Sequence, residues 1–563
     1  MINKFKDFIV SNNLDGYVIP KNDEFFTEYS KINKLKIVAN FTGSAGFILI
    51  LKKSNHLFVD GRYIIQAKKQ SGKRFIIHEI PYKRPKDILI NYYFKDIGFD
   101  PKLFTKDTLK LYFGSSCNLI PINFSLFKDQ IETINKDNLV YSIDSSITGE
   151  SSESKIERLV KIINYEKIDN LFISSNENVC WLLNIRGKDL PNSPVANFQA
   201  ILTKKNKIFI FGNTKKLKNV KKKIFNKKIV YFEKEKFFQI LNSLKGNSFC
   251  IDSKTCSIFN ENLINSKFKI KKRIDPIYIL KSIKNNTEIK NMINTHIKDG
   301  VAVTKFLHWI KNSNISRLDE IKVEKKLESF RRKSKNFLFP SFETIAGSGP
   351  NGAIIHYRSN KKSNRKLNKN HLLLVDSGGH YKWGTTDVTR TIAFNKPNKE
   401  IKEIYTRVLK GHIAVVTAKI DRIQNGNNLD KLARKSLNLV NLDYRHGTGH
   451  GVGFFMNVHE GPQSISKNNF IKLKKGMIIS NEPGYYLENN FGIRIENLVY
   501  VDGKNKSLCL KNLTWVPYEK DLIEEKLLNK FEKDYIFKYH LEAYSKISPY
   551  LNNNERKWFA KLI

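Results

Sequence analysis

The stretch His446-Gly-Thr-Gly-His-Gly451 places two imidazoles four residues apart in a loop that is otherwise built of small residues. Carboxylates stand in equally unusual contexts on both sides of it along the chain. Asp376 ends the apolar run HLLLVD, and Asp387 follows eleven residues later inside GTTDVTR. Glu482 lies in NEPGYY and Glu496 in GIRIEN. Glycine and polar residues between the two aspartates fit a turn between two strands, so we expect both carboxylates at one end of that pair.

The segment GIRIEN also shows which of its side chains should face the core. The strand period of two puts Ile493 and Ile495 on the core face. Arg494 and Glu496 then share the opposite face. Taken singly, an aspartate after a strand is usually a turn or cap residue, and a lone glutamate on a strand is usually at the surface. Taken together and in this order, the acidic and imidazole positions predict one shared site.

Four buried carboxylates with one imidazole are typical of a metal centre. The carboxylates would repel one another strongly unless cations compensated them. Oxygen-rich ligation with a single imidazole suits Mn(II), Co(II), Fe(II) or Zn(II). We expect two such ions, about 3.5–4 Å apart, that hold a bridging hydroxide and polarise a carbonyl group.

The 563 residues are enough for two to four domains. Short apolar runs alternate with helical stretches in two successive blocks, which predicts α/β layers in each. A third block opens with a helical apolar pattern from Ile289 to Ile310 and carries the site motifs, and a charged tail with helical periodicity follows it. We therefore expect domains at 1–145, 146–276 and 277–517, with a C-terminal helical extension over 518–563.

Composition excludes several other classes of protein. The 98 basic and 54 acidic residues give a net charge of +44, but 80 of the basic residues are lysine, and arginine is the residue that suits phosphate and base recognition. We expect no specific nucleic-acid partner. No run approaches about 18 uncharged apolar residues, so we expect no membrane span. Five scattered cysteines and a charged N-terminus favour a cytoplasmic protein.

The motifs resemble those of the metal-dependent pita-bread hydrolases, and among them aminopeptidase P (Xaa-Pro aminopeptidase) in its long, three-domain cytosolic form. The likeness extends over nearly the whole chain. FTGSAG (41–46) and VDGRY (59–63) look like the first creatinase-type domain, and WLLNIRG (181–187) and PNSPV (191–195) look like the second. The resemblance implies an α/β and α+β fold: two creatinase-type N-terminal α/β domains followed by a pita-bread catalytic domain.

The resemblance also assigns roles to residues of the third block. It implies that Asp387 and Glu496 bridge two divalent metals, most usually Mn(II). Glu482 would in addition carry a proton to the leaving nitrogen, and Arg494 would orient a ligating carboxylate. The implied metal ligands are Asp376, Asp387, His450, Glu482 and Glu496, and the implied catalytic residues are Glu482, His356, His459, His446 and Arg494.

The activity implied is hydrolysis of the bond between an N-terminal residue and a following proline, by a homodimeric enzyme acting on peptides with proline in second position. Such a bond has no amide N–H on the proline, so a protease that binds its substrate as an added β-strand loses a hydrogen bond there. Two alternatives stay open. One is a prolidase-like dipeptidase with the same metal site, and the other is a pita-bread module that binds partners without catalysis.

Overall fold

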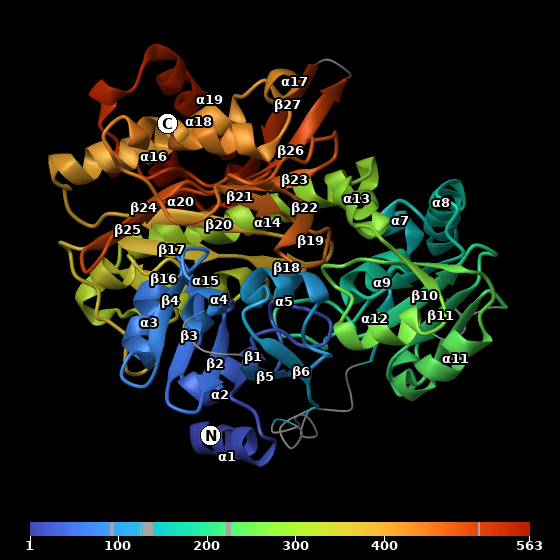
Figure 1. The fold of residues 1–563 in the computed structure, drawn as a ribbon. Helices are drawn as coiled ribbons and strands as arrows, with labels where there is room; N and C mark the ends of the chain where they lie inside the picture. Colours follow the sequence, from blue (N-terminus) through green and yellow to red (C-terminus); the bar gives the residue numbers. More distant parts are fainter. Residues whose placement is uncertain (91–94, 124–126, 128–138, 221–226, 505–506) are drawn as a thin grey trace. The chain divides into compact units, whose positions relative to one another are not determined.

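The computed structural model describes residues 1–90, 95–123, 127, 139–220, 227–504 and 507–563. The chain divides into two compact units, Met1–Tyr278 and Ile279–Ile563 (Figure 1). No helix among the described residues is both long and apolar enough to cross a membrane.

The first unit begins with a six-stranded sheet of order β4-β3-β2-β1-β5-β6. Strand β1 (Gly16–Pro20) is antiparallel to β2 (Phe47–Leu51) and parallel to β5 (Asp96–Phe99). In β2, Ile48 and Ile50 pack in one apolar cluster and the alternate side chains in another. Both faces of the sheet are therefore covered, which explains the continuous apolar run FILIL. The remaining elements are α1 (Ile2–Ser11), α2 (Lys34–Ala39), β3 (Asn55–Asp60), α3 (Ile64–Ser71), β4 (Ile76–Ile80), α4 (Pro85–Leu89), α5 (Lys106–Phe113) and β6 (Asn118–Pro121).

A second six-stranded sheet, of order β12-β11-β10-β8-β13-β14, repeats this topology. Strand β8 (Asn170–Ile173) is antiparallel to β10 (Gln199–Thr203) and parallel to β13 (Ser248–Ile251), as β1 is to β2 and β5. The two predicted α/β blocks thus share one strand order. The remaining elements include α7 (Ser145–Thr148), α8 (Ser152–Tyr165), α9 (Asn176–Leu182), β11 (Ile208–Phe211), β12 (Ile229–Phe232), α11 (Phe237–Ser243), α12 (Ile258–Asn265), β14 (Lys269–Lys272), the pair β7 (Tyr141–Ser142) and β9 (Ile185–Arg186), and α13 (Pro276–Ser282).

The second unit combines small antiparallel sheets with long helices. Its sheets have the orders β15-β18-β19, β16-β17-β20, β22-β21-β23-β26-β27 and β24-β25. The strands that carry the site motifs belong to three of these sheets. The strands are β15 (Phe337–Pro340), β16 (Ile345–Ser348), β17 (Leu373–Ser377), β18 (Gly379–Tyr381), β19 (Gly384–Thr385), β20 (Val388–Ile392), β21 (Gly449–Gly451), β22 (Glu460–Ile465), β23 (Ile478–Asn481), β24 (Gly484–Leu487), β25 (Phe491–Arg494), β26 (Asn497–Lys504) and β27 (Ser507–Asn512).

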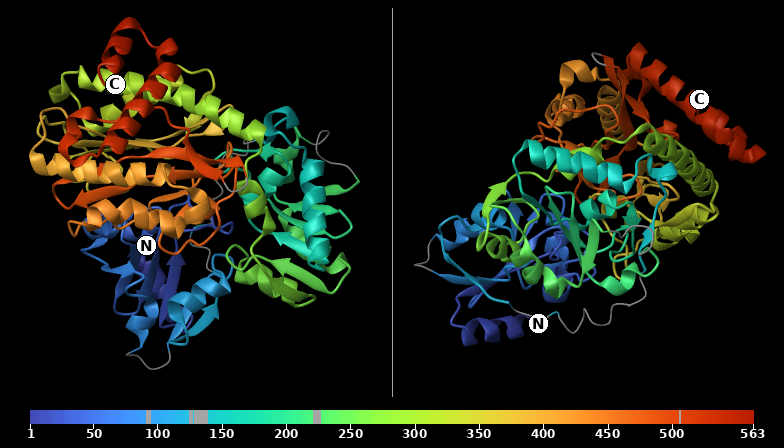
Figure 2. Two further views of the ribbon diagram at one scale, coloured as in Figure 1. Left: turned by 90° about the horizontal axis from the view of Figure 1, so that it is seen from above. Right: turned by 90° about the vertical axis from the view of Figure 1, so that its right-hand side faces the viewer.

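Most helices of this unit start where the sequence supplies a capping side chain. The predicted helix near 289–310 is α14 (Asn286–Lys311), and its N-terminus is a capping box formed by Asn285 and Glu288. The predicted helical tail contains α19 (Lys530–Ile547) and α20 (Asn553–Ala560), which begin with boxes of the same type. Their buried side chains join the apolar cluster of α16, so the tail shares the core of the unit. The other helices are α15 (Glu320–Arg332), α16 (Lys399–Val416), α17 (Ile420–Ile423) and α18 (Gly426–Asn438), and α16 and α18 lie side by side (Figure 2).

Candidate metal centre

Antiparallel pairing brings the two aspartates of the site together. Strands β17 and β20 pair with Asp376 opposite Thr389, and Asp387 immediately precedes β20. The expected strand pair with both carboxylates at one end is present, and the connection between them is longer than a turn alone, because β18 and β19 lie within it and form a separate small sheet with β15. The chain leaves β17 through Gly378, where a Cβ atom would lie 2.0 Å from the carbonyl oxygen of Thr386. Glycine at this position permits that close approach.

Three further strands position the other predicted ligands. His450 is the central residue of β21, Glu482 follows β23, and Glu496 connects β25 to β26. Ligand-capable atoms of Asp387, His450 and Glu496 all lie within 4.8 Å of one another. Nε2 of His450 lies 3.4 Å from Oε1 of Glu482 and 3.5 Å from Oδ2 of Asp387. The structure thus brings these four predicted ligands into one cluster.

The orientation of the His450 ring suits a metal ligand. Its Nδ1 lies 2.9 Å from the carbonyl oxygen of Gly451, and a carbonyl can only accept, so Nδ1 carries the proton. The lone pair of Nε2 then points at the carboxylates. Ser480 supports this arrangement, because its hydroxyl accepts a hydrogen bond from the His450 amide at 2.9 Å and donates one to Oε1 of Glu482 at 3.2 Å. A fixed tautomer is what a metal-ligating histidine needs.

Negative charge is concentrated in this cluster. Burial, followed by repulsion from Asp376 and Glu482, raises the pKa of Asp387 well above its ordinary value. Burial, followed by the charge of Asp387, does the same to the pKa of Glu496. A site that disfavours its own ionised carboxylates takes up either protons or cations. Oxygen donors with one imidazole nitrogen suit divalent first-row metals, so the residues present fit such ions.

Asp376 is held from behind by Arg494. Nη2 of Arg494 donates to Oδ2 of Asp376 at 2.6 Å, and both side chains are buried. Nε of Arg494 donates to the hydroxyl of Thr389, which itself donates to Oε2 of Glu496 at 2.7 Å. Two of the predicted ligands are therefore oriented by one arginine and one threonine. Thr389 was not predicted from the sequence, although the motif GTTDVTR contains it.

A hydrogen-bonded chain continues from Arg494 to His446. Nη1 of Arg494 donates to the hydroxyl of Tyr486 at 2.7 Å. The Nδ1 of His446 lies 2.8 Å from the Gly447 carbonyl and so carries its proton, which leaves Nε2 to accept from the Tyr486 hydroxyl at 2.9 Å. Sequence reasoning missed Tyr486, although the motif NEPGYY contains it, because a tyrosine on a strand carries no signal of such a contact.

The other two predicted catalytic histidines occupy separate loops. The rings of His459 and His450 are perpendicular, with centroids 4.3 Å apart, so His459 borders the cluster directly. His356 follows Ile355, whose carbonyl accepts a hydrogen bond from Nη1 of Arg494 at 3.4 Å. The structure therefore ties the backbone next to His356 to the same arginine that orients Asp376.

Comparison with protein-family models accounts for almost the whole chain. Models of the creatinase/prolidase N-terminal domain match residues 1–124 and 133–288. The model of metallopeptidase family M24 matches residues 290–503, and that of the C-terminal region of peptidase M24 matches 506–562.

Known proteins resemble the chain over most of their length. It is 35% identical to Xaa-Pro aminopeptidase 1 of Dictyostelium discoideum, with 99% of this chain and 94% of the relative covered. It is 34% identical to aminopeptidase P2 of Arabidopsis thaliana, with 96% and 84% covered. The solved structure of an X-prolyl aminopeptidase from Caenorhabditis elegans, described as a cytosolic enzyme with a di-nuclear active site, has a TM-score of 0.89 at 28% identity and covers 98% of this chain and 95% of its own.

Prolidase structures match a smaller part. The prolidase of Pyrococcus horikoshii has a TM-score of 0.54 at 26% identity. The match includes 99% of the prolidase but only 65% of this chain. The remaining third of the chain has no counterpart there, which disfavours the dipeptidase alternative.

The fold and the oxygen-rich cluster define a metal-dependent hydrolase with two creatinase-type domains and a pita-bread domain, as predicted. The chain belongs to metallopeptidase family M24, and within it to the Xaa-Pro aminopeptidases.

Proposed function

We propose that the chain is an aminopeptidase that releases an N-terminal residue when proline follows it, using two divalent metal ions. The observation that carries this proposal is the cluster of Asp387, His450 and Glu496, whose ligand atoms lie within 4.8 Å. Whole-chain similarity to Xaa-Pro aminopeptidases supports the substrate class. The di-nuclear site named for the relative from C. elegans supports two metals.

The proposed ligands divide into bridging and terminal groups. Asp387 and Glu496 would be shared by both ions, Asp376 would complete the ligand set of one, and His450 and Glu482 would complete that of the other. Mn(II) is the ion we propose, since four carboxylates make the site rich in hard oxygen donors. Such a pair, when bound, supplies Lewis acidity and an activated water at neutral pH.

The protein's own side chains handle the proton and the substrate. Glu482 takes the proton of the attacking water and delivers it to the proline nitrogen, which can leave only once it is protonated. His459 and His356 hydrogen-bond the reacting group of the substrate and line the proline site, and the Gly447 carbonyl keeps His446 in one tautomer. Arg494 keeps Asp376 in place, as its 2.6 Å hydrogen bond suggests.

A substrate series tests the function. We expect free arginine from Arg-Pro-Pro, and little from Arg-Ala-Pro, because the proline ring is the recognised feature. The dipeptide Arg-Pro should be a poor substrate. Rapid cleavage of Arg-Pro with no cleavage of Arg-Pro-Pro would establish the dipeptidase alternative instead.

The proposal also includes the cellular location, the oligomeric state and the domain boundaries of the protein. We propose a cytoplasmic location, supported by the five cysteines, all free, and by the relative described as cytosolic. We propose a homodimer, to be tested by light scattering of the purified chain. We also propose domains at 1–145, 146–276 and 277–517 with an extension over 518–563, which is supported by the two sheets of equal topology in the first unit.

A further inference from the structure

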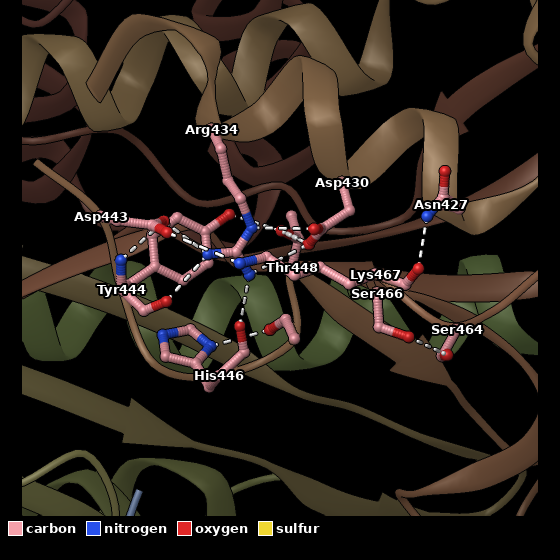
Figure 3. Close-up of polar contacts among 11 residues, drawn as sticks. Asn427, Asp430, Arg434, Asp443, Tyr444, His446, Thr448, Ser464, Ser466 and Lys467 are labelled. Atoms are coloured by element: carbon pink, nitrogen blue, oxygen red, sulfur yellow. Dashed lines mark hydrogen bonds and ion pairs between the residues drawn. The ribbon is translucent and has the colours of Figure 1, made fainter. Parts of the chain in front are cut away.

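Helix α18 carries a buried arginine outside the metal cluster. Arg434 and Asp430, one turn apart, are 5% and 1% exposed. Nε of Arg434 donates to Oδ2 of Asp430 at 2.8 Å, and Nη2 donates to Oδ1 at 3.1 Å, so the pair is bidentate. Figure 3 shows the arginine reaching from the helix to the loop that precedes β21.

The remaining N–H groups of the guanidinium donate hydrogen bonds to that loop. Nη1 donates to the Asp443 carboxylate at 2.6 Å and to the carbonyl of Tyr444 at 2.8 Å. Nη2 donates to the carbonyl of His446 at 2.6 Å. With the two bonds to Asp430, all five N–H donors of Arg434 are engaged. The guanidinium carbon also lies 3.9 Å from the centre of the Tyr444 ring.

Asp430 adds a further hydrogen bond to the loop, closer to the metal cluster. Its Oδ1 accepts a hydrogen bond from the hydroxyl of Thr448 at 2.6 Å, and that hydroxyl also contacts the hydroxyl of Tyr444. The carbonyl of Thr448 accepts a hydrogen bond from the amide of Glu482 at 2.8 Å. The backbone is thus fixed at residues 444, 446 and 448, in the segment that delivers His446 and His450.

We propose that Arg434 is a positioning residue of the reaction: it sets the backbone of residues 444–448 so that His446 and His450 are held in their working positions. This inference rests on the proposed function. The guanidinium group donates five hydrogen bonds to two backbone carbonyls and two carboxylates. Lysine cannot replace it, because its ammonium group has only three donors, all on one nitrogen atom. The buried carboxylate of Asp430 compensates the charge of Arg434, and the more exposed Asp443 pairs with both Arg434 and Lys467.

The test replaces Arg434 and a matched arginine by lysine. Arg407 on α16 is half-buried and donates to the carbonyl of Ser436 on α18 at 3.2 Å. Among the described residues it has no hydrogen bond to the loop of residues 443–448, so Arg407→Lys is the control. For Arg434→Lys we expect kcat on Arg-Pro-Pro to fall about tenfold to a hundredfold with KM within about twofold, as when the support of a ligand is removed. Arg407→Lys should keep both values within about twofold of wild type.

A spectroscopic readout separates positioning from folding. In protein loaded with Co(II), the visible absorption reports the ligand geometry at His450, so Arg434→Lys should change that spectrum at equal folded fraction, and Arg407→Lys should not. Wild-type kcat together with a wild-type spectrum in Arg434→Lys would overturn the inference. If wild type releases no arginine from Arg-Pro-Pro, the proposed function fails, while the spectrum still decides the role of Arg434.

Two further variants decide the matter if Arg434→Lys does not fold. Thr448→Val keeps every contact of Arg434 but removes the hydroxyl that donates to Asp430. Residue 448 is then no longer held by the Arg434–Asp430 pair, so we expect kcat to fall about tenfold. In Arg434→Ala, added guanidinium at millimolar concentration should restore activity, and ammonium should not. Full activity of Thr448→Val combined with no guanidinium rescue would contradict the proposal.

Discussion

Arg494 and Asp376 form a buried ion pair that engages only one oxygen of the carboxylate. Nη2 of Arg494 donates to Oδ2 at 2.6 Å, while Oδ1 is buried and accepts no hydrogen bond from the described residues. A buried carboxylate oxygen without a partner is costly. A cation coordinated by Oδ1 would remove that cost, which supports our proposal that the arginine orients Asp376 as a metal ligand.

The first prediction concerns this pair. Arg494→Lys keeps the charge but loses the fork that contacts Asp376, Tyr486 and Thr389 together. We expect the affinity for Mn(II), measured by calorimetry, to fall about tenfold to a hundredfold. Arg317→Lys, at an exposed arginine of the same unit, should leave the affinity unchanged. Equal affinity in both variants would show that Arg494 does not orient a ligand.

The second prediction concerns pH and the metal-free protein. Burial and mutual repulsion raise the pKa values of Asp387 and Glu496, so the folded state binds more protons than the unfolded state between the ordinary carboxyl range and the raised values. Stability then falls as pH rises through that window. Bound metal replaces the protons, so the gain in Tm on adding Mn(II) should grow as pH rises from the ordinary carboxyl range through the raised pKa values. A gain that shrinks over this range would contradict the charge assignment.

The third prediction assigns the proton shuttle. Glu482→Gln keeps an oxygen that can ligate a metal but cannot carry a proton, so we expect kcat to fall about 10²- to 10⁴-fold. Metal content, measured by mass spectrometry, should stay close to two ions per chain. Glu488→Gln, an exposed neighbour on the following turn, is the control. Near-normal turnover by metal-loaded Glu482→Gln would remove Glu482 from this role.

The fourth prediction concerns a buried ion cluster beside His459. Glu460, the next residue, forms ion pairs with Lys284 and Lys281, and all three side chains are buried. Glu460→Gln leaves two buried ammonium groups without their carboxylate, so we expect a loss of about 3–5 kcal/mol in the free energy of unfolding. Urea titration of the second unit's transition measures it. A loss below about 1 kcal/mol would mean that the lysines find compensation elsewhere.

The strand pattern predicted part of this site correctly. In GIRIEN, Ile493 and Ile495 lie in the apolar core and Arg494 and Glu496 face the site, as the period of two indicates. The expected strand pair that brings Asp376 and Asp387 to one end is present, but the pattern did not predict that β18 and β19 lie between them, or that β18 pairs with β15, which is distant in sequence. Non-local pairing of this kind leaves no local signal.

The supporting contacts could not be predicted for a related reason. The sequence gives no reason to single out Tyr486 or Arg434, and only the packed structure shows that both contact His446. The repeated sheet topology of the first unit is likewise a property of strand order, which two dissimilar sequences can share.

Release of arginine from Arg-Pro-Pro by metal-stripped protein, before and after addition of Mn(II), tests the central claim most directly. We predict no release from the stripped protein, release once about two ions per chain are bound, and none from Asp387→Asn under either condition. Full activity in protein shown by mass spectrometry to be metal-free, or silence in protein that holds both ions, would contradict the account.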